Sequence, residues 1–136
     1  LQHSSDEIEM ARAVLQGVAF ALRECADAFR ATGTSIDRLL AIGGGSRSDL
    51  WLSMLATLFG VDLRVPESSE LGAAFGAARL ALIAGTGAAP ADVLTRPKIN
   101  RTIAPRQELR SAYDDSYAEW QHAIAQMRER RANHKR

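Results

Sequence analysis

LLAIGGGSRSDLW, residues 39–51, is the stretch that decides the fold. An apolar run ends there in three consecutive glycines, Gly43, Gly44 and Gly45, and a second apolar pattern begins near Trp51. Glycines turn the backbone tightly and let a ligand approach it, while the first turn of a following helix offers unpaired N–H groups to an anion. The stretch therefore predicts a buried strand, a turn suited to a phosphate group and a helix.

Other interpretations of these glycines stay open on the residues alone. A tight turn with a serine as helix cap needs no ligand. The P-loop pattern fails, because no Lys follows at the spacing GxxxxGK[ST] and Arg47 comes too early. The dinucleotide-binding pattern G-x-G-x-x-G/A matches better, with Gly43 and Gly45 in the first two conserved positions and Ser48 in the third. Glu67 lies near the place of its ribose-binding acid, but a long helix before the strand and only one strand after it argue against that domain.

Upstream of the glycines, apolar residues recur every three or four positions, at Ile8, Ala11, Leu15, Val18, Leu22, Cys25 and Phe29. With a capping-box pair at Ser4 and Glu7, this period predicts one amphipathic helix that ends near Gly33. Cys25 lies on the predicted apolar stripe, so we expect a packed thiol rather than a reactive one. A single cysteine cannot form an internal disulfide, which favours a reducing cytoplasm.

Downstream, residues 38–42 and 61–65 have the composition of short strands. The helix between them would be capped by Ser46, with Asp49 at the capping-box spacing, and would stop at Gly60. Its predicted buried face comprises Trp51, Met54, Leu55, Leu58 and Phe59.

A third helix is expected to start near Ser68 and to end at Gly85 and Gly87. It would carry a bulky stripe and a stripe of small residues that lets another backbone approach closely. The bulky stripe is Leu71, Phe75, Ala78 and Leu82, and the small stripe is Gly72, Ala73, Gly76 and Ala77.

Residues 88–105 contain three prolines and no clear period, and they predict a surface excursion. Residues 106–131 predict a C-terminal helix, and the tail 132–136 is expected to fray into solvent. An aromatic stripe on that helix would form either a homodimer surface or an internal contact. Its members are Tyr113, Tyr117 and Trp120.

The order of elements predicts one α/β domain with its core in residues 1–87, in which helical crossovers join parallel strands. Two strands make an incomplete sheet with unpaired edges. The 136 residues are 46% hydrophobic with a formal charge of +1, so no global field favours nucleic acid or a membrane surface as partner. No signal peptide or membrane span is predicted, and we expect the start without Met to belong to a piece of a longer protein.

Three ordered blocks resemble the C-terminal domain of the FGGY carbohydrate kinases. They are GGGSRSDLW at residues 43–51, ARAVLQGVAFALRECADAF at residues 11–29 and ESSELGAAFGAARLA at residues 67–81. The likeness runs from about Leu1 to Gly85. Within the family, the Arg-Ser pair and the Trp after the glycines are most similar to the xylulokinases.

This resemblance implies the C-terminal part of an actin-like, ribonuclease H-like ATPase, with ATP and Mg²⁺ as cofactors. The implied reaction is transfer of the γ-phosphoryl group to a sugar, such as a pentulose, bound by an N-terminal domain. It also implies that Gly43, Gly44, Gly45 and Ser46 line the phosphates and ribose of ATP, and that Asp49 lies near the adenine. Helix capping explains Asp49 equally well. The small stripe of the third helix would pack beneath the nucleotide cleft.

We assign no catalytic residue and no metal ligand to this sequence. Phosphoryl transfer needs a carboxylate and Mg²⁺, but each acid near the glycines has a cap, strand or turn explanation. These acids are Asp49, Asp62, Glu67 and Glu70. The resemblance places the catalytic acid upstream of Leu1. A kinase for glycerol, gluconate or ribulose and a stand-alone nucleotide or dinucleotide module are the alternatives.

Overall fold

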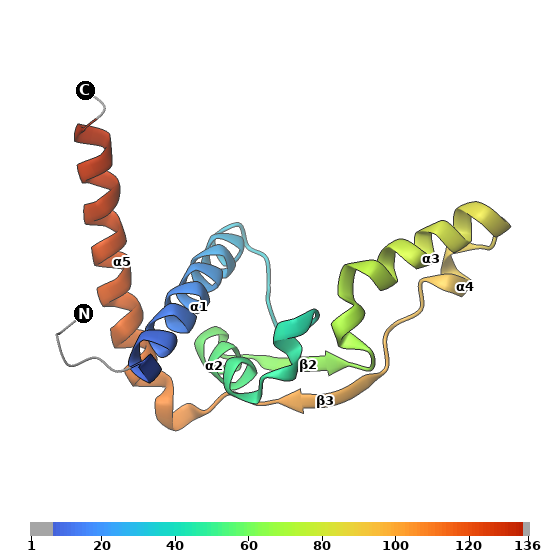
Figure 1. The fold of residues 1–136 in the computed structure, drawn as a ribbon, viewed down its shortest axis with the longest axis horizontal. Helices are drawn as coiled ribbons and strands as arrows, with labels where there is room; N and C mark the ends of the chain where they lie inside the picture. The colour runs from blue at the N-terminus through green and yellow to red at the C-terminus, as the bar shows by residue number, and fades with distance from the viewer. Residues whose placement is uncertain (1–6, 135–136) are drawn as a thin grey trace.

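The computed structural model describes residues 7–134 as helices around a small sheet (Figure 1). The helices are α1 (Glu7–Ala31), α2 (Asp49–Phe59), α3 (Gly72–Thr86), α4 (Pro90–Val93) and α5 (Arg110–Asn133), and the strands are β1 (Arg38–Leu40), β2 (Asp62–Pro66) and β3 (Ile99–Ile103). Short 3₁₀ turns precede α2, α3 and α5: η1 (Gly44–Arg47), η2 (Ser69–Leu71) and η3 (Gln107–Leu109). The predicted α/β class is confirmed, while Ser4 of the predicted capping box lies outside the described residues. Over residues 7–134, no helix combines the length and apolar character that crossing a membrane requires.

The sheet has three strands in the order β1-β2-β3. β1 runs parallel to β2, with Leu39 opposite Leu63, and β3 runs antiparallel to β2, with Ile103 opposite Leu63. The two predicted strands pair in parallel as expected, whereas the third strand, β3, lies in residues 88–105, where no regular element was predicted. β3 is short, lies at the sheet edge and is mostly exposed, so INRTI lacks the apolar alternation from which strands are predicted.

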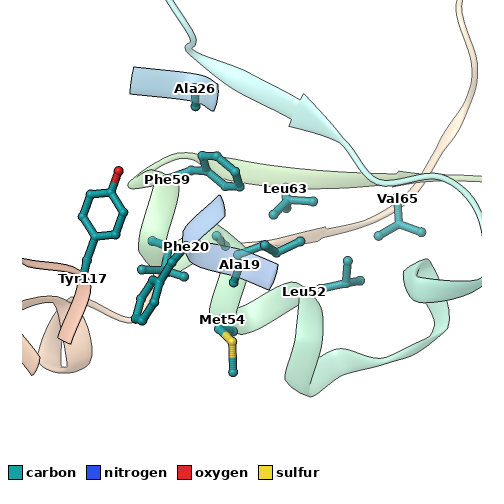
Figure 2. Packing of buried hydrophobic residues seen from close by; sticks show 12 residues of the cluster. Ala19, Phe20, Ala26, Leu52, Met54, Phe59, Leu63, Val65 and Tyr117 are labelled. Atoms are coloured by element: carbon teal, nitrogen blue, oxygen red, sulfur yellow. The ribbon is translucent and has the colours of Figure 1, made fainter. Parts of the chain in front are cut away.

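The hydrophobic core lies where α2 meets the sheet, α1 and α5 (Figure 2). The predicted buried face of α2 is confirmed, with Trp51 only partly covered. Its buried members are Met54, Leu55, Leu58 and Phe59. Gly60 adopts the left-handed conformation (φ 68°) and ends α2 as predicted.

α1 buries a different stripe from the predicted one. Its buried residues are Ala19, Phe20 and Ala26, whereas Val18 and Cys25 are exposed. One residue along a helix corresponds to a rotation of about 100°. The apolar period indicates a helix, but which side of its stripe is covered depends on where α2 and α5 pack. The prediction of a packed Cys25 thiol is therefore wrong.

α3 extends away from the core (Figure 1), and none of its residues is buried. Phe75 of the bulky stripe and Gly76 of the small stripe are both exposed. Among the described residues, α3 mainly contacts η2 and α4. Within the described residues, Gly72 of the small stripe approaches Gly43, whereas a Cβ added to Gly76 would meet no atom within 4 Å. α3 ends at Gly87 as predicted.

The first half of α5 packs on α1 through aromatic rings. The Phe20 ring centroid lies 5.6 Å from that of Tyr117 and 6.0 Å from that of Trp120. The Arg23 guanidinium lies 4.2 Å from the centre of the Tyr117 ring, and its Nη1 donates to Asp114 at 2.6 Å. Two alternatives were predicted for the aromatic stripe, a homodimer surface and an internal contact. The structure shows the internal contact. The helix itself begins at residue 110, after η3, rather than at residue 106.

Stability at alkaline pH should depend on Tyr117. Burial raises the pKa of Tyr117 to about 12, with help from the charge of Asp27, whose Oδ2 accepts the phenolic hydrogen bond at 3.2 Å. In the unfolded chain tyrosine ionises near its ordinary value of 10.0. The stability from this group is therefore fully present below that pH and falls as the pH rises toward 12, because only the unfolded state loses the proton.

We expect urea unfolding between about pH 9 and about pH 11 to show a steeper loss of stability for the parent chain than for Tyr117→Phe. Tyr117→Phe also loses the hydrogen bond to Asp27, which lowers stability by the same amount at each pH. Comparing how steeply stability falls with pH in the two proteins removes this constant difference. Equal slopes would contradict the raised pKa of Tyr117.

Candidate functional site

The glycine turn connects β1 to α2 through η1. Gly43 has φ 84° and ψ −176°, a conformation that residues with a Cβ rarely adopt. Gly44 and Gly45 are exposed, and within residues 7–134 their N–H groups have no hydrogen-bond acceptor. The turn therefore presents two adjacent backbone donors to solvent, which is the arrangement that binds anions in proteins.

Ser46 anchors the turn to the segment after β2. Its side chain is buried, and its hydroxyl donates to the Gly43 carbonyl at 2.7 Å. The Ser69 hydroxyl lies 2.7 Å from Ser46 Oγ and must be the donor, since the only hydroxyl proton of Ser46 is already used. The Gly43 N–H donates to the Ser69 carbonyl at 2.7 Å. These bonds fix the backbone of the turn.

Ser48, rather than Ser46, caps α2. Its hydroxyl accepts a hydrogen bond from the Trp51 N–H at 3.3 Å. The predicted capping box of Ser46 and Asp49 is wrong, because η1 continues through Arg47 and moves the helix start two residues along the chain. Asp49 is consequently the first residue of α2, where the helix dipole favours a carboxylate.

The segment after β2 completes the surroundings of the turn. β1 and β2 are parallel, so the segments after their carboxyl ends lie side by side. Gly72 has φ 38° and ψ −116°, and a Cβ added there would lie 3.5 Å from the Gly43 nitrogen. Sequence reasoning missed that Ser69 belongs to this site, whereas Gly72 is a member of the small stripe that was expected beneath the cleft. The predicted pair of parallel strands was the signal that could have indicated Ser69.

Arg101 reaches the same turn from β3. Its Nη2 donates to the Ser46 carbonyl at 2.8 Å, and its Nη1 forms an ion pair with the Asp49 carboxylate. Arg101 lies in the segment with no clear period, so the sequence offers no signal for it. The five predicted site residues, Gly43 to Ser46 and Asp49, thus lie together on one turn and helix start.

A hollow of about 280 Å³ adjoins the turn between β1 and α2. Its lining is mainly apolar, including Ile42 and Trp51, and Gly45 and Ser46 also border it. Within residues 7–134, no group of three His, Cys, Asp or Glu side chains is arranged to hold a metal ion. The site therefore combines exposed backbone donors with an apolar wall, as small-molecule sites commonly do.

Residues 1–85 match the sequence profile of the C-terminal domain of the FGGY family of carbohydrate kinases. The chain belongs to this family. The xylulose kinase of Escherichia coli K12 is 44% identical to this FGGY chain over 84 residues, which are 62% of the chain and 17% of the relative. A glycerol kinase of Gloeobacter violaceus is 34% identical over 135 residues, covering 95% of the chain and 26% of the relative.

The fold is also similar to that of a solved "xyloylose kinase" from Brucella ovis. The TM-score is 0.80 at 46% identity, over 95% of this chain and 27% of that protein. The FGGY chain thus spans between 17% and 27% of the length of these relatives. The predicted family resemblance is confirmed.

Proposed function

We propose that this chain is the nucleotide-binding part of an ATP-dependent sugar kinase. The observation that carries the proposal is the glycine turn at the carboxyl end of β1, in the parallel pair β1–β2, which exposes two N–H groups and borders a hollow between β1 and α2. Ligands of open α/β sheets bind at this edge. Membership of a carbohydrate kinase family supplies the reaction class. For the complete protein we infer the actin-like, ribonuclease H-like ATPase fold that the resemblance implies.

In this proposal Gly44 and Gly45 donate their N–H groups to the nucleotide phosphates, and Gly43 sets the turn that exposes them. Ser46 acts through its hydrogen bonds to Gly43 and Ser69, because its hydroxyl is buried. The exposed side of the Asp49 carboxylate lies near the adenine, where it can accept from the amino group.

The chain contributes positioning and charge stabilisation rather than proton transfer. Proteins commonly hold Mg²⁺ through one or two carboxylates together with substrate phosphates and waters, but the carboxylate of Asp49 is already paired with Arg101 and so does not fit this role. We therefore propose that the Mg²⁺ ligands, the catalytic acid and the sugar-binding residues belong to the rest of a cytoplasmic kinase.

For the sugar we propose a pentulose such as D-xylulose, phosphorylated at its 5-hydroxyl. The support is the xylulose kinase relative at 44% identity. Glycerol is the second candidate, because the glycerol kinase of Gloeobacter violaceus matches over 95% of this chain.

Calorimetric titration of the purified 136-residue chain with ATP, ADP and NAD tests the proposal. We expect ATP and ADP to bind competitively and NAD to bind more weakly, because the site lacks a complete dinucleotide domain. Preference for NAD would contradict the kinase assignment. The chain alone should release no ADP when ATP and D-xylulose are added, and measurable sugar-dependent release would show that the chemistry is complete within these residues.

A further inference from the structure

Arg101 joins three parts of the candidate site. It lies on β3 opposite Val65 of β2, and its side chain is about one third exposed (34%). One guanidinium nitrogen donates to the Ser46 carbonyl at 2.8 Å and the other pairs with the Asp49 carboxylate. A single planar group thus ties β3 to the end of the glycine turn and to the first residue of α2.

Asp49 would otherwise place an uncompensated negative charge beside the anion site. Its side chain is 75% exposed and comes three residues after Ser46, at the start of α2. The triphosphate of ATP carries several negative charges, and a nearby carboxylate repels them. Arg101 offsets that charge, and its second nitrogen restrains the Ser46 carbonyl at the same time.

We propose that Arg101 is a positioning residue for the nucleotide phosphates, which neutralises Asp49 and fixes the glycine turn at Ser46. This role rests on the proposed nucleotide site. It needs the planar fork of arginine, since a lysine ammonium supplies the charge but does not match two acceptors in fixed positions. The charge effect distinguishes this role from a purely structural contact, because it acts only on ligands that carry phosphate.

Titration of the 136-residue chain with ATP and with adenosine tests this role. We expect Arg101→Gln to raise the Kd for ATP about fivefold and to change the Kd for adenosine by less than about twofold, because adenosine has no phosphate charge. Asp49→Asn combined with Arg101→Gln should recover part of the lost ATP affinity, because it removes the uncompensated carboxylate but does not restore the bond to the Ser46 carbonyl. Arg101→Lys should lie between the parent and Arg101→Gln.

Arg106→Gln is the matched control. Arg106 is exposed and pairs with Glu108, and its backbone N–H donates to the hydroxyl of Thr57. Thr57 lies in the second half of α2, away from the glycine turn. We therefore expect Arg106→Gln to leave the ATP affinity unchanged. Circular dichroism checks the folding of each variant, and Arg101→Lys replaces Arg101→Gln if the latter does not fold.

An unchanged ATP affinity in the Arg101 variants, an equal loss for ATP and adenosine, or no recovery in the double variant would each overturn the role of Arg101. Absence of ATP binding by the parent chain would instead overturn the proposed nucleotide site, and this role with it.

Discussion

Phe20→Ala is expected to lower the free energy of unfolding by about 3–5 kcal/mol, the usual cost of truncating a buried aromatic ring. Phe20 is 4% exposed and lies where α1 meets α5. Its ring contacts those of Tyr117 and Trp120, so the substitution leaves a cavity and removes aromatic pairs at once. Urea unfolding followed by circular dichroism measures the loss.

Phe29→Ala is the matched control, because it makes the same chemical change on the same helix. Phe29 is 61% exposed, so we expect its loss to change the free energy of unfolding by no more than about 0.5 kcal/mol. Equal losses for the two variants would contradict the packing of α1 against α5 through Phe20.

The contrast between these two phenylalanines shows what local pattern can predict. The apolar period predicted a helix at α1, and the structure has one over Glu7–Ala31. The same period placed Cys25 in the core and did not single out Phe20, because the covered side of a helix is set by distant partners, here α2 and α5. β3 was missed for a related reason, since pairing with β2 rather than its own sequence makes it a strand.

Some residues of the candidate site could likewise be predicted from local pattern, and others could not. Gly43, Gly44 and Gly45 could be found because a strand, a turn and a helix follow one another within a few residues. Ser69 and Arg101 were missed, since their bonds to Ser46 join residues 23 and 55 positions apart, and only Ser69 could have been inferred from the predicted pair of parallel strands. Such contacts depend on sheet order, and the antiparallel strand that brings Arg101 to the turn has no periodic signal.

Gly43→Ala is expected to weaken ATP binding about thirtyfold and to lower the free energy of unfolding by about 1–3 kcal/mol, the cost of holding a non-glycine residue in such a backbone conformation. At φ 84° and ψ −176°, an alanine must either stay strained or rotate the backbone. Rotation would turn the N–H groups of Gly44 and Gly45 away from a shared anion. It would also break the bond from the Gly43 N–H to the Ser69 carbonyl. Calorimetric titration with ATP and urea unfolding measure the two effects.

Gly85→Ala separates this conformational effect from the loss of a glycine as such. Gly85 lies within α3 at an ordinary helical φ, and an added Cβ would meet no atom within 4 Å. Alanine should therefore stabilise the chain by about 0.5–1 kcal/mol through its helix propensity and leave ATP binding unchanged. If Gly43→Ala retained the parent affinity, the exposed N–H groups of the turn would not be what holds the phosphates. If it lost affinity while Gly85→Ala did not, the cause would be the backbone conformation at Gly43, because the two variants add the same methyl group.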